Sequence, residues 1–111
     1  MKKIENYVNI PEGWHNLEGI VAEYSFFNYD LGLQIVMSID NHGFLNCIHV
    51  SIAPIRSLKK CSSEKEYEKL IVMNAPEIIH SFFGDREFAR APNDARYPTN
   101  KHFFALLKEN E

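Results

Sequence analysis

Cationic and aromatic side chains alternate near the C-terminal end of the chain, a pattern typical of sites for anionic ligands. Guanidinium groups pair bidentately with phosphate or carboxylate, and aromatic faces stack on nucleobases. The alternation predicts a site for a nucleotide-like small molecule or for single-stranded nucleic acid. Its residues are Arg86, Phe88, Arg90, Arg96, Tyr97, Lys101, His102 and Phe103. Asp85, Glu87 and Asp94 stand in the same stretch, so ordinary surface ion pairs are the alternative interpretation.

A His-x-Ser step lies in a segment with the alternation of a β-strand. Residues two apart on a strand share a face, so we expect His49 and Ser51 to lie side by side and count them among the ligand-binding candidates. Acid–base hydrolysis by paired histidines would need a second such step, and His80 and His102 lack the spacing. We therefore predict no catalytic residues and keep a small His-dependent phosphoesterase as an alternative.

Metal and cofactor motifs are absent from the sequence. The 5 histidines and 2 cysteines show neither H-x-x-x-H nor C-x-x-C spacing, and the 5 glycines are scattered singly rather than gathered in a phosphate-binding loop. We predict no metal and no cofactor, and we expect Cys47 and Cys61 to be reduced thiols.

The charge of the chain is unevenly distributed. A formal net charge of −3 argues against duplex DNA as a partner, because DNA affinity comes mainly from phosphate neutralisation. No Lys or Arg occurs from Ile4 to Ile55, whereas the cations other than Lys2 and Lys3 lie at Arg56 or later. The later part of the chain is therefore the better candidate for an anionic partner.

Composition favours one soluble domain over residues 1–111. Hydrophobic residues make up 45% and charged residues 24%, as in an ordinary globular protein. No run reaches the roughly 18 consecutive apolar residues that a membrane helix needs, and no apolar segment follows Lys2 and Lys3. We predict a cytoplasmic protein that does not bind membranes.

Local patterns predict strands first and a helical segment late in the chain. Alternation or β-branched content predicts strands over 4–10, 20–27, 33–39 and 44–52, with a turn at 40–43. Ser63 and Glu66 have the spacing of a capping box, so a helix should begin there. Pro76 predicts a kink or two short helices, the second over 75–83 and closed by Gly84. Strands over 87–91 and 102–107 follow, separated by a polar loop over 92–100.

These elements predict an α+β fold with the order ββββ-α(α)-ββ. The helical segment should cover one face of a mainly antiparallel sheet. The other face then carries a mixed set of side chains, and strand alternation cannot bury both members of Phe26-Phe27, Phe82-Phe83 or Phe103-Phe104 in one core. We therefore predict a homo-oligomer, a dimer or higher.

From about residue 46 to 107 the order of features resembles an uncharacterised family of small phage- and prophage-encoded proteins. The resemblance is carried by His49-Val50-Ser51, Arg56, the capping box at Ser63, the segment from Phe88 to Pro92 and His102-Phe103-Phe104. It implies a small α+β fold and a phage-like context, in which the protein would work in the host cytoplasm.

These observations leave three hypotheses for the function. The first is a non-enzymatic binding protein that sequesters a small anionic ligand, for instance as a phage counter-defence protein. The second is an inhibitor or interaction module that acts on a host protein through exposed Phe residues or the acidic half. The third is the phosphoesterase that uses His49.

Overall fold

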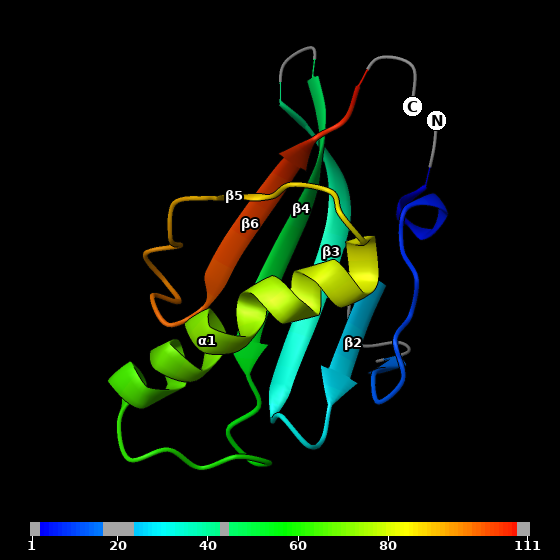
Figure 1. Ribbon diagram of the computed structural model, residues 1–111. Coiled ribbons are helices and arrows are strands. Elements are labelled where there is room, and N and C mark those ends of the chain that lie inside the picture. Colours follow the sequence, from blue (N-terminus) through cyan, green and yellow to red (C-terminus); the bar gives the residue numbers. More distant parts are fainter. Residues whose placement is uncertain (1–2, 17–23, 43–44, 109–111) are drawn as a thin grey trace.

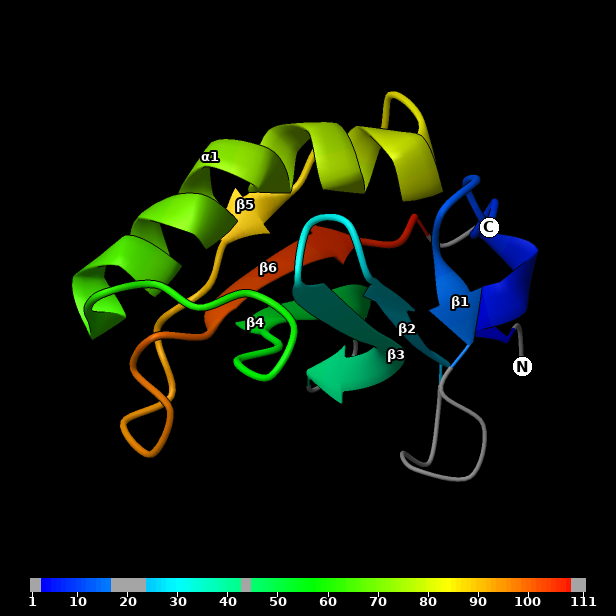
Figure 2. The same ribbon diagram turned by 90° about the horizontal axis from the view of Figure 1, so that it is seen from below.

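The computed structural model describes residues 3–16, 24–42 and 45–108. Within these residues, one antiparallel sheet of 6 strands is covered on one face by a single long helix (Figure 1), so the predicted α+β class and its element order are confirmed. Figure 2 shows the two layers edge on, with α1 on one side of the sheet only. The strand order is β1-β2-β3-β4-β6-β5. The strands are β1 (His15–Asn16), β2 (Tyr24–Asn28), β3 (Leu33–His42), β4 (Leu45–Pro54), β5 (Ala89–Arg90) and β6 (Lys101–Leu106).

The hairpin of β3 and β4 forms the centre of the sheet, as the alternating pattern predicts. Its register places Ile35 opposite Ile52 and Met37 opposite Val50, so the apolar positions of both strands face the helix and are almost fully buried. The turn before β3 requires a glycine. Gly32 has a φ of 69°, and a Cβ at this position would collide with the Lys59 side chain.

Helix α1 (Glu64–Phe83) begins and ends at the predicted signals. The backbone N–H of Glu66 donates to Ser63 Oγ at 3.3 Å, and Glu66 in turn accepts from the N–H of Ser62 at 3.0 Å. Gly84 closes the helix with a φ of 68°. The helix runs through Pro76 without interruption, so the alternative of two short helices is wrong. Burial of one helix face against the sheet offsets the cost of a helix-interior proline, about 3 kcal/mol.

The core lies between α1 and the sheet. Phe82 is fully buried, and its ring centroid lies 5.2 Å from that of Trp14 and 5.5 Å from that of Phe26. Phe83 is buried as well, so the expectation that no Phe-Phe pair shares one core is wrong for this pair. Adjacent residues on a helix point only about 100° apart, whereas adjacent residues on a strand point to opposite faces.

The N-terminal segment differs from the prediction. Instead of a strand over 4–10 it forms a 3₁₀ helix, η1 (Ile4–Asn6), whose Ile4 is buried in the core. The N–H of Asn9 donates to the carbonyl of Phe82 at 2.9 Å, so this segment passes the end of α1, and the edge of the sheet is the short β1.

Of the strand predicted over 87–91, only the two residues of β5 are in strand conformation. Residues 20–23 and Phe44 of two predicted strands lie outside the described residues.

The face of the sheet that points away from α1 carries Ser38, His49, Ser51, His102 and Phe104, which alternate with the buried positions of β3, β4 and β6. Among the described elements none is a helix that covers this face (Figure 2).

No described helix has the combination of length and apolarity that crossing a membrane requires. The homo-oligomer stays a prediction.

Candidate functional site

The residues predicted to form one anionic-ligand site lie at several places in the structure. The segment 86–90 leaves the end of α1 and enters β5, which pairs with β6 so that Arg90 lies opposite Phe103. Arg90 and Phe103 line a cavity beside α1, whereas His102, the neighbour of Phe103 on β6, belongs to the opposite face of the sheet. Strand alternation separates residues that are adjacent in the sequence.

Arg90 and Phe103 line an apolar cavity of about 340 Å³ between α1 and the strands β5 and β6, which we call the helix groove. The groove is lined by Val72, Ala75, Pro76, Ile79, Phe88, Arg90 and Phe103. Arg90 is exposed, and within the described parts of the chain its guanidinium forms no hydrogen bond or ion pair. The four helix residues of this set were not predicted as site residues, because only the packing of α1 beside β5 places them there.

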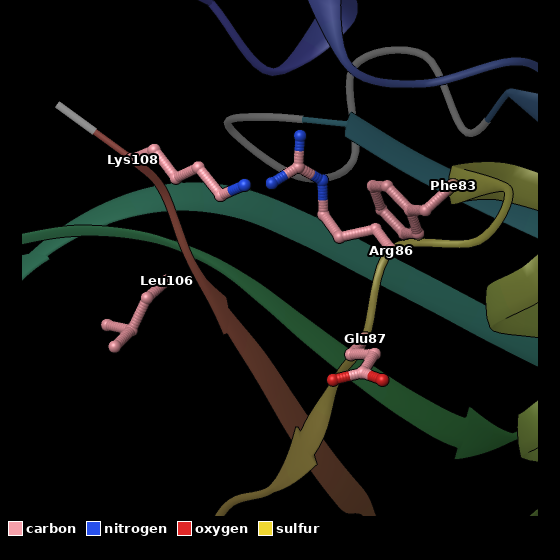
Figure 3. Close-up of a pocket in the computed structure, with 5 residues that line it drawn as sticks. All are labelled: Phe83, Arg86, Glu87, Leu106 and Lys108. Atoms are coloured by element: carbon pink, nitrogen blue, oxygen red, sulfur yellow. The ribbon is translucent and has the colours of Figure 1, made fainter. Parts of the chain in front are cut away.

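A second pocket, the end pocket, lies where the chain leaves α1 and β6. It has a volume of about 550 Å³ and is lined by Phe83, Arg86, Glu87, Leu106 and Lys108. The side-chain ends of Arg86 and Lys108 point toward one another, whereas Glu87 and Leu106 point away from them (Figure 3). The Arg86 guanidinium lies 5.5 Å from the centroid of the Tyr7 ring, and both cations have further interactions within the chain. An anion would therefore have to share these cations with existing partners.

His49 and His102 lie side by side on the face of the sheet that points away from α1. Their ring centroids are 5.2 Å apart and their planes differ by 19°, so the rings are stacked. His102 stands directly opposite Ser51 in the register of β4 and β6. The Nε2 atom of His102 is buried and has no hydrogen-bond partner in the described structure. We call these two residues the histidine pair. Local sequence patterns do not reveal this pair, since it depends on the register of two strands about 50 residues apart.

Two aspartates flank the histidine pair. Asp40 Oδ2 lies 3.8 Å from His49 Nδ1, and Ser38 Oγ donates to Asp40 Oδ1 at 3.0 Å, which holds that carboxylate in place. Near His102, hydrogen bonds from Arg96 lower the pKa of the Asp94 carboxyl, and the charge of His102 lowers this pKa further. His49 also borders a cavity of about 390 Å³, whose other walls are Cys47, Ala91, Pro92, Phe104 and Leu106.

Arg96 and Lys101 have partners within the fold. Arg96 binds Asp94 through its Nε and Nη2 atoms at 3.3 and 3.1 Å, which is the surface ion pair of the alternative interpretation, and Tyr97 beside it is exposed. The Lys101 side chain is only 1% exposed, and its Nζ lies 3.1 Å from Glu68 Oε2 and donates to the carbonyl of Pro98. Since Glu68 belongs to α1 and Lys101 to β6, this ion pair links the helix to the strand.

Both cysteines are free thiols in the structure. Burial of Cys47, and to a smaller extent the nearby Asp40, raise the pKa of the Cys47 thiol, which opposes a role as a nucleophile. Among the described residues, no three His, Cys, Asp or Glu side chains come together in a way that could hold a metal ion.

Comparisons of the chain with protein-family models, with curated proteins and with solved structures found no match. The resemblance to a phage-encoded family therefore stays a prediction.

Proposed function

We propose that this protein binds a small anionic ligand with an apolar or aromatic body in the helix groove. The observation that carries the proposal is the Arg90 guanidinium, which has no partner among the described residues and borders an otherwise apolar cavity. A guanidinium offers several N–H donors in a fixed plane, and these suit phosphate or carboxylate. The rings of Phe88 and Phe103 offer surface on which the body of the ligand can stack.

The size of the groove limits the ligand to a small molecule. Its volume of about 340 Å³ lies near the lower end of the range for small-molecule sites, roughly 300–1,000 Å³. Affinity would come from burial of the apolar body and from charge-assisted hydrogen bonds to Arg90, worth about 1.5–3 kcal/mol. If the chain is phage-encoded, as the resemblance predicts, such binding would sequester a small anionic signal of the host.

Replacing Arg90 with alanine is expected to weaken binding of the anion by about 10- to 150-fold, the factor that 1.5–3 kcal/mol corresponds to. The measurement is isothermal titration calorimetry with AMP, cyclic AMP and phenylacetate as probes. Arg96→Ala is the matched control, because it removes the same charge outside the groove and should leave the affinity unchanged. Equal losses in both variants, or no heat of binding to the wild type with any probe, would contradict the proposal.

A second candidate function is hydrolysis of a phosphodiester at the histidine pair. His49 borders a cavity, and Asp40 lies close enough to its Nδ1 to orient the ring. His49 would take a proton from a water molecule as the water oxygen attacks phosphorus. The P–O bond to the leaving group would break, and His49 would then lose the proton to solvent. His102, stacked on His49, would hold the ring in place.

His49→Ala is expected to lower the rate of this hydrolysis by at least about 100-fold, the lower end of the usual range for a general base. The substrate is bis(p-nitrophenyl) phosphate, whose p-nitrophenolate leaves without a proton and is followed by its absorbance. His80→Ala serves as the control, since His80 is exposed at the end of α1. A wild-type rate no greater than that of buffer would exclude the second candidate.

A further inference from the structure

The charge of the helix groove indicates which class of anion it takes, and this step rests on the function proposed above. Arg90 is the one charged side chain among the described residues that line the groove. A phosphate monoester carries a charge of roughly −1.5 to −2 at neutral pH, whereas a carboxylate carries one. The part of that charge which Arg90 does not balance would lie against apolar walls, where it is unfavourable. A carboxylate balances Arg90 one to one and can accept two parallel N–H bonds from it.

The walls of the groove indicate the body of this ligand. Ala75 and Ile79 form the helix side, and the rings of Phe88 and Phe103 stand on the strand side. The walls other than Arg90 are apolar side chains, so the ligand gains most from an aromatic ring or a short alkyl chain. The structure therefore favours one apolar group of ring size over an extended polar body such as a ribose.

One backbone hydrogen bond of α1 is interrupted beside the groove, at the proline inside the helix. Pro76 has no N–H, so the carbonyl of Val72 lacks the donor that it would have four residues further along α1. Both residues line the groove. A hydroxyl or N–H of the ligand that reaches this carbonyl would replace the missing donor.

We propose that the ligand of the helix groove is a small apolar monocarboxylic acid, held by Arg90 through its carboxylate, and that a hydroxyl or N–H on its body strengthens binding at the Val72 carbonyl. The observations behind this are the single charge, the apolar walls and the interrupted helical hydrogen bond at Pro76.

The test is calorimetry of the full chain with four probes: phenylacetate, 4-hydroxyphenylacetate, phenyl phosphate and AMP. Phenylacetate is expected to bind at least about 10-fold more tightly than phenyl phosphate, which carries the same ring and more charge. The hydroxylated acid is expected to bind more tightly than phenylacetate. Pro76→Ala, which restores an N–H to the helix, should abolish that gain from the hydroxyl. Arg90→Lys keeps the positive charge but loses the planar set of guanidinium N–H donors. It should lower the affinity for the two carboxylates less than Arg90→Ala does.

Two results would overturn the inference. Tighter binding of phenyl phosphate or AMP, lost in Arg90→Ala, would refute the carboxylate class while leaving the proposed function in place. Absence of binding for all four probes would refute both the class and the proposed function. Far-ultraviolet circular dichroism of each variant confirms that it is folded, so a loss of affinity reports on the groove.

Discussion

Phe82→Ala is expected to lower the free energy of unfolding by about 3–5 kcal/mol, the usual cost of truncating a buried phenylalanine. Phe82 is fully buried, and it joins Trp14 from the N-terminal segment to Phe26 of β2. Its removal leaves a cavity where three parts of the chain meet, and the rigid sheet cannot collapse to fill it. Urea denaturation followed by tryptophan fluorescence measures the change, since Trp14 is the single tryptophan and packs against Phe82.

The exposed Met73→Ala on the same helix is the control for this prediction. Met73 is 70% exposed, so its truncation should change the free energy of unfolding by less than about 0.5 kcal/mol. If Phe82→Ala is too unstable to purify, Phe82→Leu should show a smaller loss in the same direction. A loss below about 1 kcal/mol for Phe82→Ala would mean that Phe82 does not occupy the centre of the core.

Glu68→Ala is expected to destabilise the protein by about 3 kcal/mol, because it leaves the Lys101 ammonium buried without its countercharge. The Lys101 side chain is 1% exposed and that of Glu68 is 46% exposed, so water screens only one end of this ion pair. For this reason we expect the lower end of the range for broken buried pairs. The carbonyl of Pro98 remains as an acceptor but carries no charge. Chemical denaturation at neutral pH gives the free energy of unfolding.

Lys101→Met distinguishes a requirement for the ion pair from a requirement for packing. Methionine fills a similar volume and needs no partner, so replacing a buried charge in this way is often neutral or stabilising. We expect Lys101→Met to be at least as stable as the wild type, and Glu68→Ala to cost little in the Lys101→Met background. Equal destabilisation by Glu68→Ala in both backgrounds would show that Glu68 contributes through its own contacts. The same variant tests the sequence prediction that Lys101 binds ligand, because its affinity for anions should be unchanged.

The groove and the histidine pair lie on opposite sides of the sheet, so their functions can be tested separately. Variants of Arg90 report on the helix side, and variants of His49 report on the face without a helix. The two candidate functions therefore make independent predictions. Loss of ligand affinity in Arg90→Ala without change in any hydrolysis would assign binding to the groove alone.

Several features of the fold can be predicted from the sequence because they depend on residues that are neighbours along the chain. The capping box at Ser63 and the glycine at Gly84 mark both ends of α1, since the groups that they satisfy lie within one turn. The alternation over 33–39 and 44–52 predicts the central hairpin, because one face of each strand must be buried. Local patterns predicted the secondary structure less well in segments that form few backbone hydrogen bonds with the sheet. The segment 4–10 was wrongly predicted as a strand, and residues 87–91 form a strand only at Ala89–Arg90.

The candidate site depended on tertiary structure in a way that no local pattern reveals. The sequence by itself determined the α+β order, the bounds of the helix and the presence of a cationic and aromatic stretch after it. Only the pairing of β4, β5 and β6 decided that Arg90 faces the helix groove, that His102 stacks on His49, and that Lys101 is buried against Glu68. The physical reason is that a strand sends successive side chains to opposite faces, so the register between distant strands decides which residues share a site.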